Sequence, residues 1–393
     1  MTAEPSLLVV DDNEDNRYTL SRRLARAGYT DVATASNGRE ALHFLSSRPF
    51  DLLLLDIMMP EMNGYEVLEQ LKSSTELRDL PVIMISALDE MDSVIRCVEL
   101  GAEDYLAKPF NPTLLRARIG ASLEKKRLRD EMRSSLQRLE HEMDAARKLQ
   151  LGMLPQVFPA FTPQQPVRVH ALMEPAREVG GDLYDCFYAS DNLFCFLVGD
   201  VSGKGAPAAM FMARTRSLVR MAVELWLQLS PDAISLTRIA ETVNRELCQN
   251  NDDRMFVTLF LGLLDARKGV LAYVNAGHPA PCILRLAGDL EKLDGKAEMP
   301  LGVRHNTRYH SRSASLRCGD AVFVVTDGVI EAMNARSELY TSKRLDAVLR
   351  AVCEASPEDM VRSVTDDVHT FTGSAPKADD LTVLALRWFT TTP

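Results

Sequence analysis

Acidic residues in this chain fall into two groups that could each hold a divalent cation. Near the start of the chain the candidates are Asp11, Asp12 and Asp56. Further along, a second group consists of Asp182, Asp200, Asp327 and Asp379. Carboxylate oxygens are the ligands that Mg²⁺ and Mn²⁺ prefer. The two groups predict one site that accepts a phosphoryl group and another that removes one, and therefore an enzyme under phosphorylation control.

The elements expected around the first group alternate between strands and helices. Uninterrupted apolar runs at 7–10, 51–56 and 82–86 are typical of parallel strands buried on both faces. Amphipathic segments lie around them, at 13–27, 38–47, 64–73 and 90–100. This alternation predicts a doubly wound α/β domain, with a five-stranded parallel sheet.

The acidic residues of this region follow strand ends. Because the carboxyl ends of parallel strands meet at one edge of the sheet, Asp11, Asp12 and Asp56 should converge there. They would repel one another unless a hard cation such as Mg²⁺ lay among them. Ser86 and Lys108 end the fourth and fifth strands, so a hydroxyl and an ammonium can bind the oxygens of a phosphoryl group on Asp56. A cis peptide bond before Pro109 would aim the lysine inward.

The segments "VVDDNEDN", "LLLLDIMMPEMNGYE", "MISAL" and "DYLAKPF" carry this pattern over about the first 120 residues, which resemble the response-regulator receiver family. The resemblance implies phosphorylation of Asp56 by a sensor histidine kinase, with Asp11, Asp12 and Asp56 holding Mg²⁺. It also implies that Ser86 and Tyr105 occupy the family's two switch positions and that Lys108 contacts the phosphoryl group.

The next stretch, 121–154, has the composition of a helical linker. Apolar residues recur at heptad spacing, at Met132, Leu136, Leu139, Met143 and Ala146. We expect a parallel coiled coil and a homodimer through this linker. A solvated helix packed on one domain is the alternative, and a monomeric mass in light scattering would favour it. A proline-rich stretch from Pro155 to Pro166 then marks a domain boundary.

Beyond the boundary, strand-like runs are grouped around long helical patterns. The expected strands are 167–173, 192–201, 255–264, 270–274 and 321–325. The expected helices are 206–229 and 232–248, with a helical pair in 343–371. This order predicts a layered α+β sandwich. The expected domains are therefore 1–120, 121–154 and 155–393.

Four acidic turns in this region lie next to strands. A single aspartate of this kind is usually a turn residue, but four beside buried strands favour a metal site. Two Mg²⁺ or Mn²⁺ ions about 3.5–4 Å apart would activate a bridging water toward a phosphorus atom. Such a reaction needs no Ser, Cys or His nucleophile.

The segments "ARKLQLGMLP", "EPAREVGGDLYDCF", "GDVSGKGAPAAMFMA", "NAGHPAP", "TDGVIEAMN" and "DDLTVLAL" resemble the SpoIIE-like branch of the metal-dependent PPM serine/threonine phosphatases. The resemblance covers about 240 residues and implies two stacked β-sheets flanked by helices. It also implies that Asp200 bridges both metals and that the Val201 carbonyl helps to bind one. Asp182, Asp327 and Asp379 would complete the ligand set, directly or through water.

Further residues are candidates for supporting roles. Asp185 and Asp380 could orient the metal ligands. Arg177 could grip the substrate phosphate, although an exposed structural arginine is the alternative. His278 could act as a general acid or hold its turn. Thr341 stands where many relatives have glycine, which concerns local loop geometry.

Composition and charge limit the function further. The chain of 393 residues has a formal net charge of -10 and 46% hydrophobic residues, which disfavours nucleic-acid binding and fits globular domains. No basic and apolar leader and no membrane-length apolar run is present in the sequence, so we expect a cytoplasmic protein without membrane partners.

Two other functions compete with this interpretation. The Gly-Gly-Asp in "VGGDLYD" would suit a diguanylate cyclase, but Leu183 and Tyr184 replace the acid and aromatic that follow in that family. A non-catalytic phosphatase-like adaptor under receiver control is the stronger alternative, although it would tend to lose metal ligands. We expect a phosphoserine/phosphothreonine protein phosphatase. On the resemblance, its substrate would be an anti-sigma-factor antagonist in a partner-switching pathway.

Overall fold

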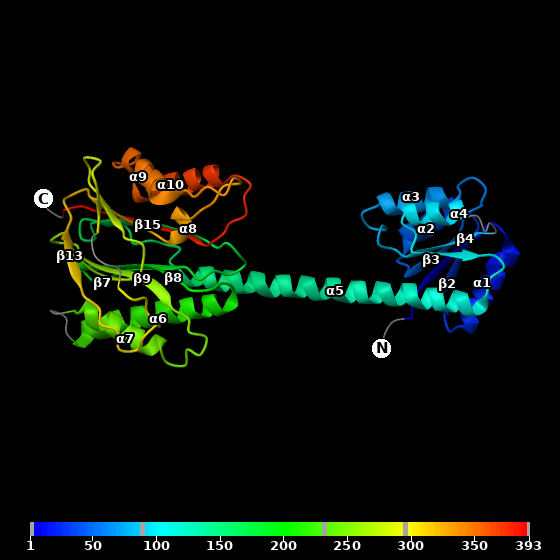
Figure 1. Cartoon of the computed structure of the whole chain (residues 1–393), viewed down its shortest axis with the longest axis horizontal. Coiled ribbons are helices and arrows are strands. Elements are labelled where there is room, and N and C mark those ends of the chain that lie inside the picture. Colours follow the sequence, from blue (N-terminus) through cyan, green and yellow to red (C-terminus); the bar gives the residue numbers. More distant parts are fainter. Residues whose placement is uncertain (1–3, 87–90, 230–233, 294–297, 391–393) are drawn as a thin grey trace. The chain divides into compact units, whose positions relative to one another are not determined.

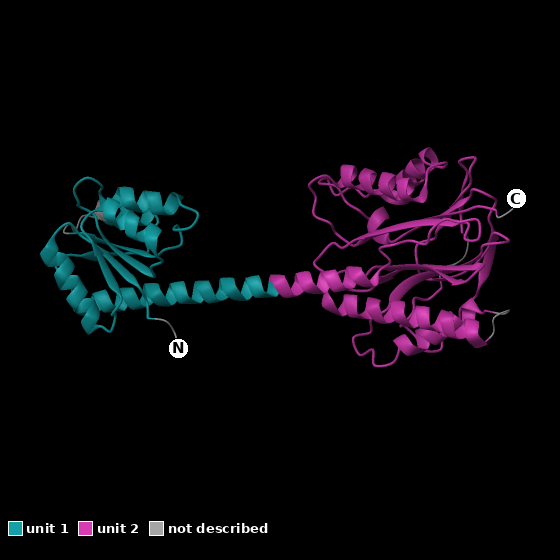
Figure 2. Cartoon of the chain, turned by 180° about the vertical axis from the view of Figure 1, so that it is seen from behind, with its two compact units in different colours: residues 1–139 teal, residues 140–393 magenta. Residues whose placement is uncertain are grey.

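The computed structural model describes residues 4–86, 91–229, 234–293 and 298–390 (Figure 1). It divides into two compact units, 1–139 and 140–393, which are coloured separately in Figure 2. None of the helices in these described ranges combines the length and the apolar character that a membrane span requires.

The first unit is a five-stranded parallel sheet in the order β2-β1-β3-β4-β5. Alternate residues of β1 enter separate cores, with Leu8 in one and Leu7 in the other, so both faces are covered. The predicted doubly wound α/β fold is confirmed. The elements are β1 (Leu7–Val10), α1 (Glu14–Arg26), β2 (Val32–Ala35), α2 (Gly38–Ser47), β3 (Leu52–Asp56), α3 (Gly64–Ser73), β4 (Val82–Ser86), α4 (Met91–Glu99) and β5 (Asp104–Ala107).

Local capping sets several of these helix ends. The Asn13 side chain accepts hydrogen bonds from the backbone of Asp15 and Asn16, so α1 begins at Glu14. A capping box between Asn63 and Glu66 starts α3. The expected start of α4 at Glu90 lies outside the described residues.

Helix α5 spans Pro112–Met153 without interruption. Ile119 in its first part is buried in the core of the first unit. Leu154, directly after its end, is buried in the core of the second. Between them Met132, Leu136 and Leu139, positions of the predicted heptad seam, are 66%, 50% and 53% exposed among the described residues.

The second unit contains two antiparallel sheets, ordered β13-β10-β9-β8-β7 and β12-β11-β14-β15-β6. Helices α6 and α7 cover the first sheet and α9 and α10 cover the second (Figure 1). The elements are β6 (Val167–Glu174), β7 (Leu183–Ser190), β8 (Leu193–Val201), α6 (Ala206–Leu229), α7 (Leu236–Leu247), β9 (Val257–Asp265), β10 (Val270–Ala276), β11 (Cys282–Leu284), β12 (Leu290–Lys292), β13 (Arg312–Ser315), β14 (Ala321–Val325), α8 (Asp327–Ile330), α9 (Thr341–Ala351), α10 (Pro357–Thr372) and β15 (Leu381–Trp388).

The two-sheet α+β sandwich is therefore confirmed, with small differences in its helices. Helix α7 begins at Leu236 because the Ser235 side chain accepts the Arg238 N–H, and the expected start at Asp232 lies outside the described residues. Asp327, expected at a strand end, is the first residue of the one-turn helix α8. The short strands β11, β12 and β13 were not predicted, because three or four residues carry too little periodicity.

Candidate phosphoacceptor and metal sites

The first acidic group converges at the carboxyl edge of the parallel sheet. Asp11 follows β1 and Asp56 ends β3, and these two strands pair directly. Ligand oxygens of Asp11, Asp12 and Asp56 all lie within 4.8 Å of one another, an arrangement found once among the described residues. Asp11 and Asp56 are buried and Asp12 is exposed. A group of hard oxygens this close fits Mg²⁺.

Lys108 joins this group from the end of β5. Its Nζ lies 2.8 Å from Asp11 Oδ2 and 2.8 Å from Asp56 Oδ1. Burial raises the pKa of Asp56 to about 6, although Lys108 opposes the shift and the other two aspartates add to it. The Lys108–Pro109 peptide bond is cis, as predicted. An ammonium this close to the Asp56 carboxylate is placed to contact a phosphoryl group there.

Ser86 and Tyr105 lie on neighbouring strands beside this edge. Ser86 is buried at the end of β4. Tyr105 is half-buried on β5, which pairs with β4, and it packs against the core of this unit. Ser86 therefore lies on the strand next to that of Asp56, and Tyr105 lies one strand further along the sheet.

The second acidic group is assembled from both sheets of the sandwich. Asp182 precedes β7 and Asp200 lies near the end of β8, and these two strands pair. Asp327 follows β14 and Asp379 precedes β15, which pair in the other sheet. A hydrogen bond of 2.8 Å from Thr326 Oγ1 to Asp182 Oδ2 connects the two sheets at this point.

Burial and mutual repulsion raise the pKa values of carboxylates in this second group. Burial raises the pKa of Asp200 to about 7, and the charges of Asp327 and Asp379 add to the shift. Burial is the main cause of the raised pKa of Asp327, and the charge of Asp379 adds to it. Burial also raises the pKa of Asp182 well above its usual range, and the charge of Asp200 is the next largest cause. Such a group of repelling oxygens fits divalent cations, which would compensate the negative charge.

The turn before Asp182 is held by side chains from distant parts of the chain. Asp380 accepts the N–H of Ala176 at 2.7 Å and that of Gly181 at 2.6 Å. The Gln150 side chain of α5 accepts the Gly180 N–H and donates to the Gly180 carbonyl. A Cβ at Gly181 would lie 2.8 Å from the Val201 carbonyl oxygen, so glycine lets this turn approach the proposed carbonyl ligand.

Lys204, in the loop after β8, brings a positive charge to the same place. Its Nζ lies 3.1 Å from Asp379 Oδ2 and also donates to the Ala378 carbonyl at 2.5 Å. The two side chains are 35% and 44% exposed. Asp379 is thus the more accessible member of the DD pair, whereas Asp380 is committed to the backbone.

Two of the candidate supporting residues have partners outside the acidic group. Asp185 is buried and pairs with Arg216 at 3.0 Å and Arg220 at 3.1 Å, both on α6, so its carboxylate contacts this helix, and its predicted role beside the metal ligands stays a prediction. Burial lowers the pKa of His278 to about 3, and its Nδ1 lies 3.0 Å from Thr258 Oγ1. The lowered pKa favours the predicted structural role in the turn over that of a general acid. Arg177 is exposed, and no ion pair in the described part of the chain includes it.

Three residues that contact the site were not singled out from the sequence. Gln150 lies in the quoted segment "ARKLQLGMLP", yet a glutamine on a helix gives no signal for a distant backbone partner. Thr326 and Lys204 each stand one or a few residues from a predicted ligand, and their partners belong to the opposite sheet or loop. For Thr326 and Lys204, the signal that could have found them was their closeness in sequence to predicted metal ligands.

Comparison with known proteins agrees with this geometry. Residues 190–389, slightly more than half of the chain, match the family model of Stage II sporulation protein E (SpoIIE), and the chain belongs to this family. Residues 7–120 match the response regulator receiver domain. The chain thus combines a receiver domain with a phosphatase domain of the SpoIIE type.

Individual relatives match one part or the other. Protein IcfG of Synechocystis sp. is 29% identical over 283 residues, which cover 65% of this chain and 42% of that protein. The probable transcriptional regulator ycf27 of Cyanidium caldarium is 42% identical over 119 residues, 30% of this chain and 46% of the relative. The chain spans less than half the length of these two curated relatives. The SiaA-PP2C domain of Pseudomonas aeruginosa superimposes with a TM-score of 0.56 at 19% identity, over 65% of this chain and 98% of that domain, which shows a shared fold.

Proposed function

We propose that this chain is a response regulator whose output is a metal-dependent phosphoserine/phosphothreonine protein phosphatase. The observation that carries the proposal is the placement of aspartates on paired strands of both sheets, Asp182 and Asp200 in one and Asp327 and Asp379 in the other, with a hydrogen bond from Thr326 to Asp182 between the sheets. The domain organisation that we propose remains a receiver at 1–120, a linker at 121–154 and a phosphatase domain at 155–393.

In the proposed site, Asp200 would be shared by two Mn²⁺ or Mg²⁺ ions, and the Val201 carbonyl, Asp182, Asp327 and Asp379 would complete the set of residues that hold them. When bound, such ions supply an activated water and neutralise charge on the phosphate. The residues of the chain hold this arrangement: Thr326 orients Asp182, and Asp380 and Gln150 order the turn before it.

The receiver would control this activity. A sensor histidine kinase would phosphorylate Asp56, with Mg²⁺ held by Asp11, Asp12 and Asp56. Ser86 and Tyr105 would then repack the surface that leads into α5. The exposed seam supports a homodimer through α5, and a change in that coiled coil would move the helix that follows Gly205. We expect phosphorylation to activate the enzyme.

Membership of the SpoIIE family supports a phosphorylated anti-sigma-factor antagonist as the protein substrate. A non-catalytic adaptor would tend to lose metal ligands, but every carboxylate that the resemblance implies is present in this chain. Catalysis is therefore the favoured output.

The first experiment is hydrolysis of para-nitrophenyl phosphate in Mn²⁺, with and without beryllofluoride as a mimic of phosphoryl-Asp56. Metal-dependent turnover that rises with beryllofluoride in the wild type, but not in Asp56→Ala, would support both sites. Turnover that does not change with beryllofluoride would contradict the proposed control of the phosphatase by the receiver. Absence of turnover in every state, including toward a phosphorylated protein, would favour the adaptor.

A further inference from the structure

A cavity of about 130 Å³ lies directly beside the proposed phosphatase site. Asp379 and Gly328, which follows Asp327, form part of its wall. The rest of the wall is largely apolar, with Ala332, Met333, Leu339, Val368, Pro376 and Leu381. An apolar cavity of about 150 Å³ can hold a benzene ring, so this one suits a single branched or aromatic side chain.

The cavity is reachable from solvent through an apolar rim. Met333 is 40% exposed and Leu339 is 50% exposed, and the two residues pair as an antiparallel bridge. Exposed apolar side chains around a hollow are typical of a binding site. The neighbouring ammonium of Lys377 lies 2.5 Å from Glu174, so this charge is already compensated. Glu331 also contributes to the lining, which disfavours an acidic occupant.

The loop that forms the rim has strained backbone. Ser337 and Thr341 have φ values of 59° and 68°, in the left-handed region that residues other than glycine rarely adopt, and Thr341 is in addition β-branched. The loop is nevertheless held in place, because Tyr340 is buried and its hydroxyl donates to Asp367 Oδ2 at 2.6 Å. Strain of this kind is concentrated at ligand-binding segments.

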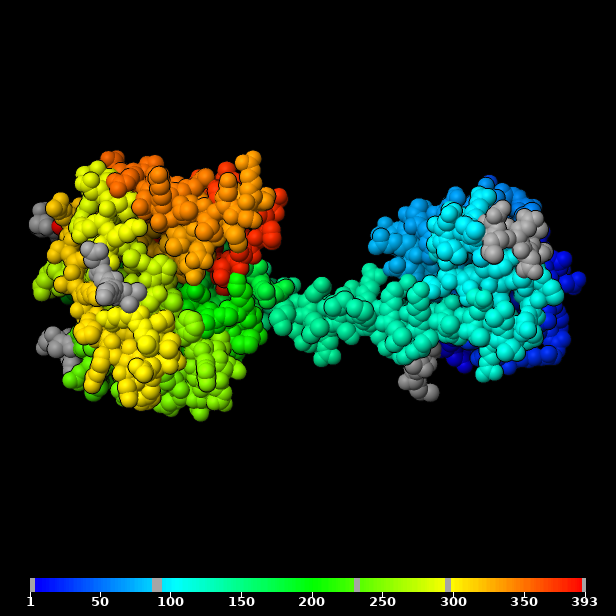
Figure 3. All heavy atoms as spheres, in the orientation of Figure 1, coloured from blue at the N-terminus to red at the C-terminus, as the bar shows by residue number. Residues whose placement is uncertain are grey.

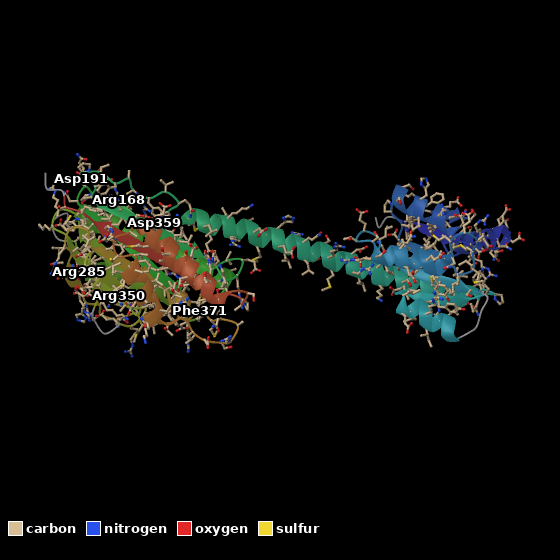
Figure 4. All side chains as sticks on the ribbon, turned by 90° about the horizontal axis from the view of Figure 1, so that it is seen from above. Arg168, Asp191, Arg285, Arg350, Asp359 and Phe371 are labelled. Carbon is tan, nitrogen blue, oxygen red and sulfur yellow. The ribbon has the colours of Figure 1, made fainter. Side chains whose placement is uncertain are left out.

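Helix α10 supports the same loop from beneath. The Tyr340 ring contacts Phe371 edge-on at 5.6 Å between centroids, and Phe371 is labelled in Figure 4. In the space-filling view the helices α9 and α10 lie together on one face of the second unit (Figure 3). The cavity is therefore built on a fixed base.

We propose that this cavity binds an apolar side chain of the phosphoprotein substrate, close in sequence to its phosphoserine or phosphothreonine. The inference rests on the proposed phosphatase function, because Asp379 belongs both to the cavity wall and to the metal site. A substrate whose phosphate reaches these carboxylates places its neighbouring residues over the cavity. The cavity thereby selects the sequence around the phosphorylated residue.

The test uses phosphoserine peptides that carry one leucine or one glycine at successive positions on either side of the phosphoserine. At one position, leucine is expected to raise kcat/KM about tenfold over glycine, in line with the selectivity of apolar pockets. In Ala332→Leu, which fills the cavity, this ratio should fall toward one. Ala335→Leu is the matched control, because Ala335 is exposed in the same loop and lies outside the cavity; it should keep the ratio.

Leu339→Ala provides a second variant, because its half-exposed side chain can be shortened with little risk to folding. It should also reduce the ratio. Hydrolysis of all peptides without a leucine preference, or an unchanged ratio in folded Ala332→Leu and Leu339→Ala, would overturn the cavity proposal alone. No hydrolysis of any peptide or of para-nitrophenyl phosphate in Mn²⁺ would overturn the proposed function and the cavity with it.

Discussion

The side-chain amide of Gln150 pairs with the backbone of Gly180 through two hydrogen bonds. Nε2 donates to the Gly180 carbonyl at 2.5 Å, and Oε1 accepts the Gly180 N–H at 3.1 Å. Gln150 is buried on α5, and Gly180 lies two residues before Asp182. The linker helix therefore contacts the turn that presents a proposed metal ligand.

Replacement of Gln150 by leucine is expected to weaken Mn²⁺ binding about tenfold. The substitution keeps the volume but leaves a buried N–H and a buried carbonyl without partners, each costing about 1–3 kcal/mol. Calorimetric titration with Mn²⁺ measures the effect. Lys148→Leu, at an exposed position of the same helix, should bind like the wild type. Equal affinity in both variants would show that the pair does not order the turn.

Asp200→Ala and Asp327→Ala should each abolish hydrolysis while the fold is retained. Their carboxylates repel their neighbours in the metal-free chain, so their removal relieves an unfavourable interaction. The readouts are para-nitrophenyl phosphate turnover and circular dichroism. Asp191→Ala is the control, because Asp191 lies in the turn at the other end of the β7–β8 hairpin (Figure 4). Undiminished turnover in either active-site variant would reject the assignment.

Substitution of the adjacent residues Asp379 and Asp380 should affect different properties, metal binding in the first case and stability in the second. Asp380 accepts two backbone N–H groups, so Asp380→Ala should lower the free energy of unfolding by about 2–4 kcal/mol, as expected for buried hydrogen bonds to a charged group. Asp379→Ala should weaken Mn²⁺ binding with little change in stability. Chemical denaturation and Mn²⁺ titration of both variants separate the two roles. Weaker Mn²⁺ binding in Asp380→Ala together with lower stability in Asp379→Ala would mean that the two roles are assigned to the wrong residues.

Thr341→Gly is expected to stabilise the protein. Thr341 is a β-branched residue at φ 68°, and relief of such strain contributes about 1 kcal/mol or more. Ser342→Gly, one position further in the same helical turn, should instead destabilise by about 1 kcal/mol. Thermal unfolding of the two variants distinguishes these signs. A lower melting temperature in Thr341→Gly would mean that the threonine side chain compensates for its backbone.

The metal-free chain should lose stability as the pH rises toward neutrality. Burial raises the pKa of Asp200 from 3.8 to about 7, so between these values the folded state binds more protons than the unfolded state. The free energy of unfolding therefore decreases with pH across this window. Unfolding with EDTA and with Mn²⁺ at several pH values tests the prediction. A stabilisation by Mn²⁺ that shrinks as the pH rises would contradict it.

Much of the architecture could be predicted from the amino-acid sequence. Helices α2 and α3 have the predicted bounds, because Asn37 and Asn63 provide local capping signals in front of amphipathic segments. The apolar strands that precede Asp11 and Asp56 could be recognised by composition alone. Because the carboxyl ends of parallel strands lie at one edge of the sheet, the convergence of these carboxylates was predictable.

The roles of individual polar residues depended on tertiary structure. Asp182 and Asp185 are three residues apart in one segment, yet one faces the carboxylate group and the other pairs with the arginines of α6. Burial lowers the pKa of His278 to about 3, which the sequence pattern around it does not encode.

The sequence by itself determined which segments form strands and helices and where acidic residues follow them, because those features depend on near neighbours. Tertiary structure alone decided that Gln150 contacts Gly180 and that a cavity adjoins the site. It also decided that Asp380 accepts backbone hydrogen bonds while Asp379 stays partly exposed to solvent. Hydrogen-bond partners and desolvation are set by residues far away in the chain, so no local pattern records them.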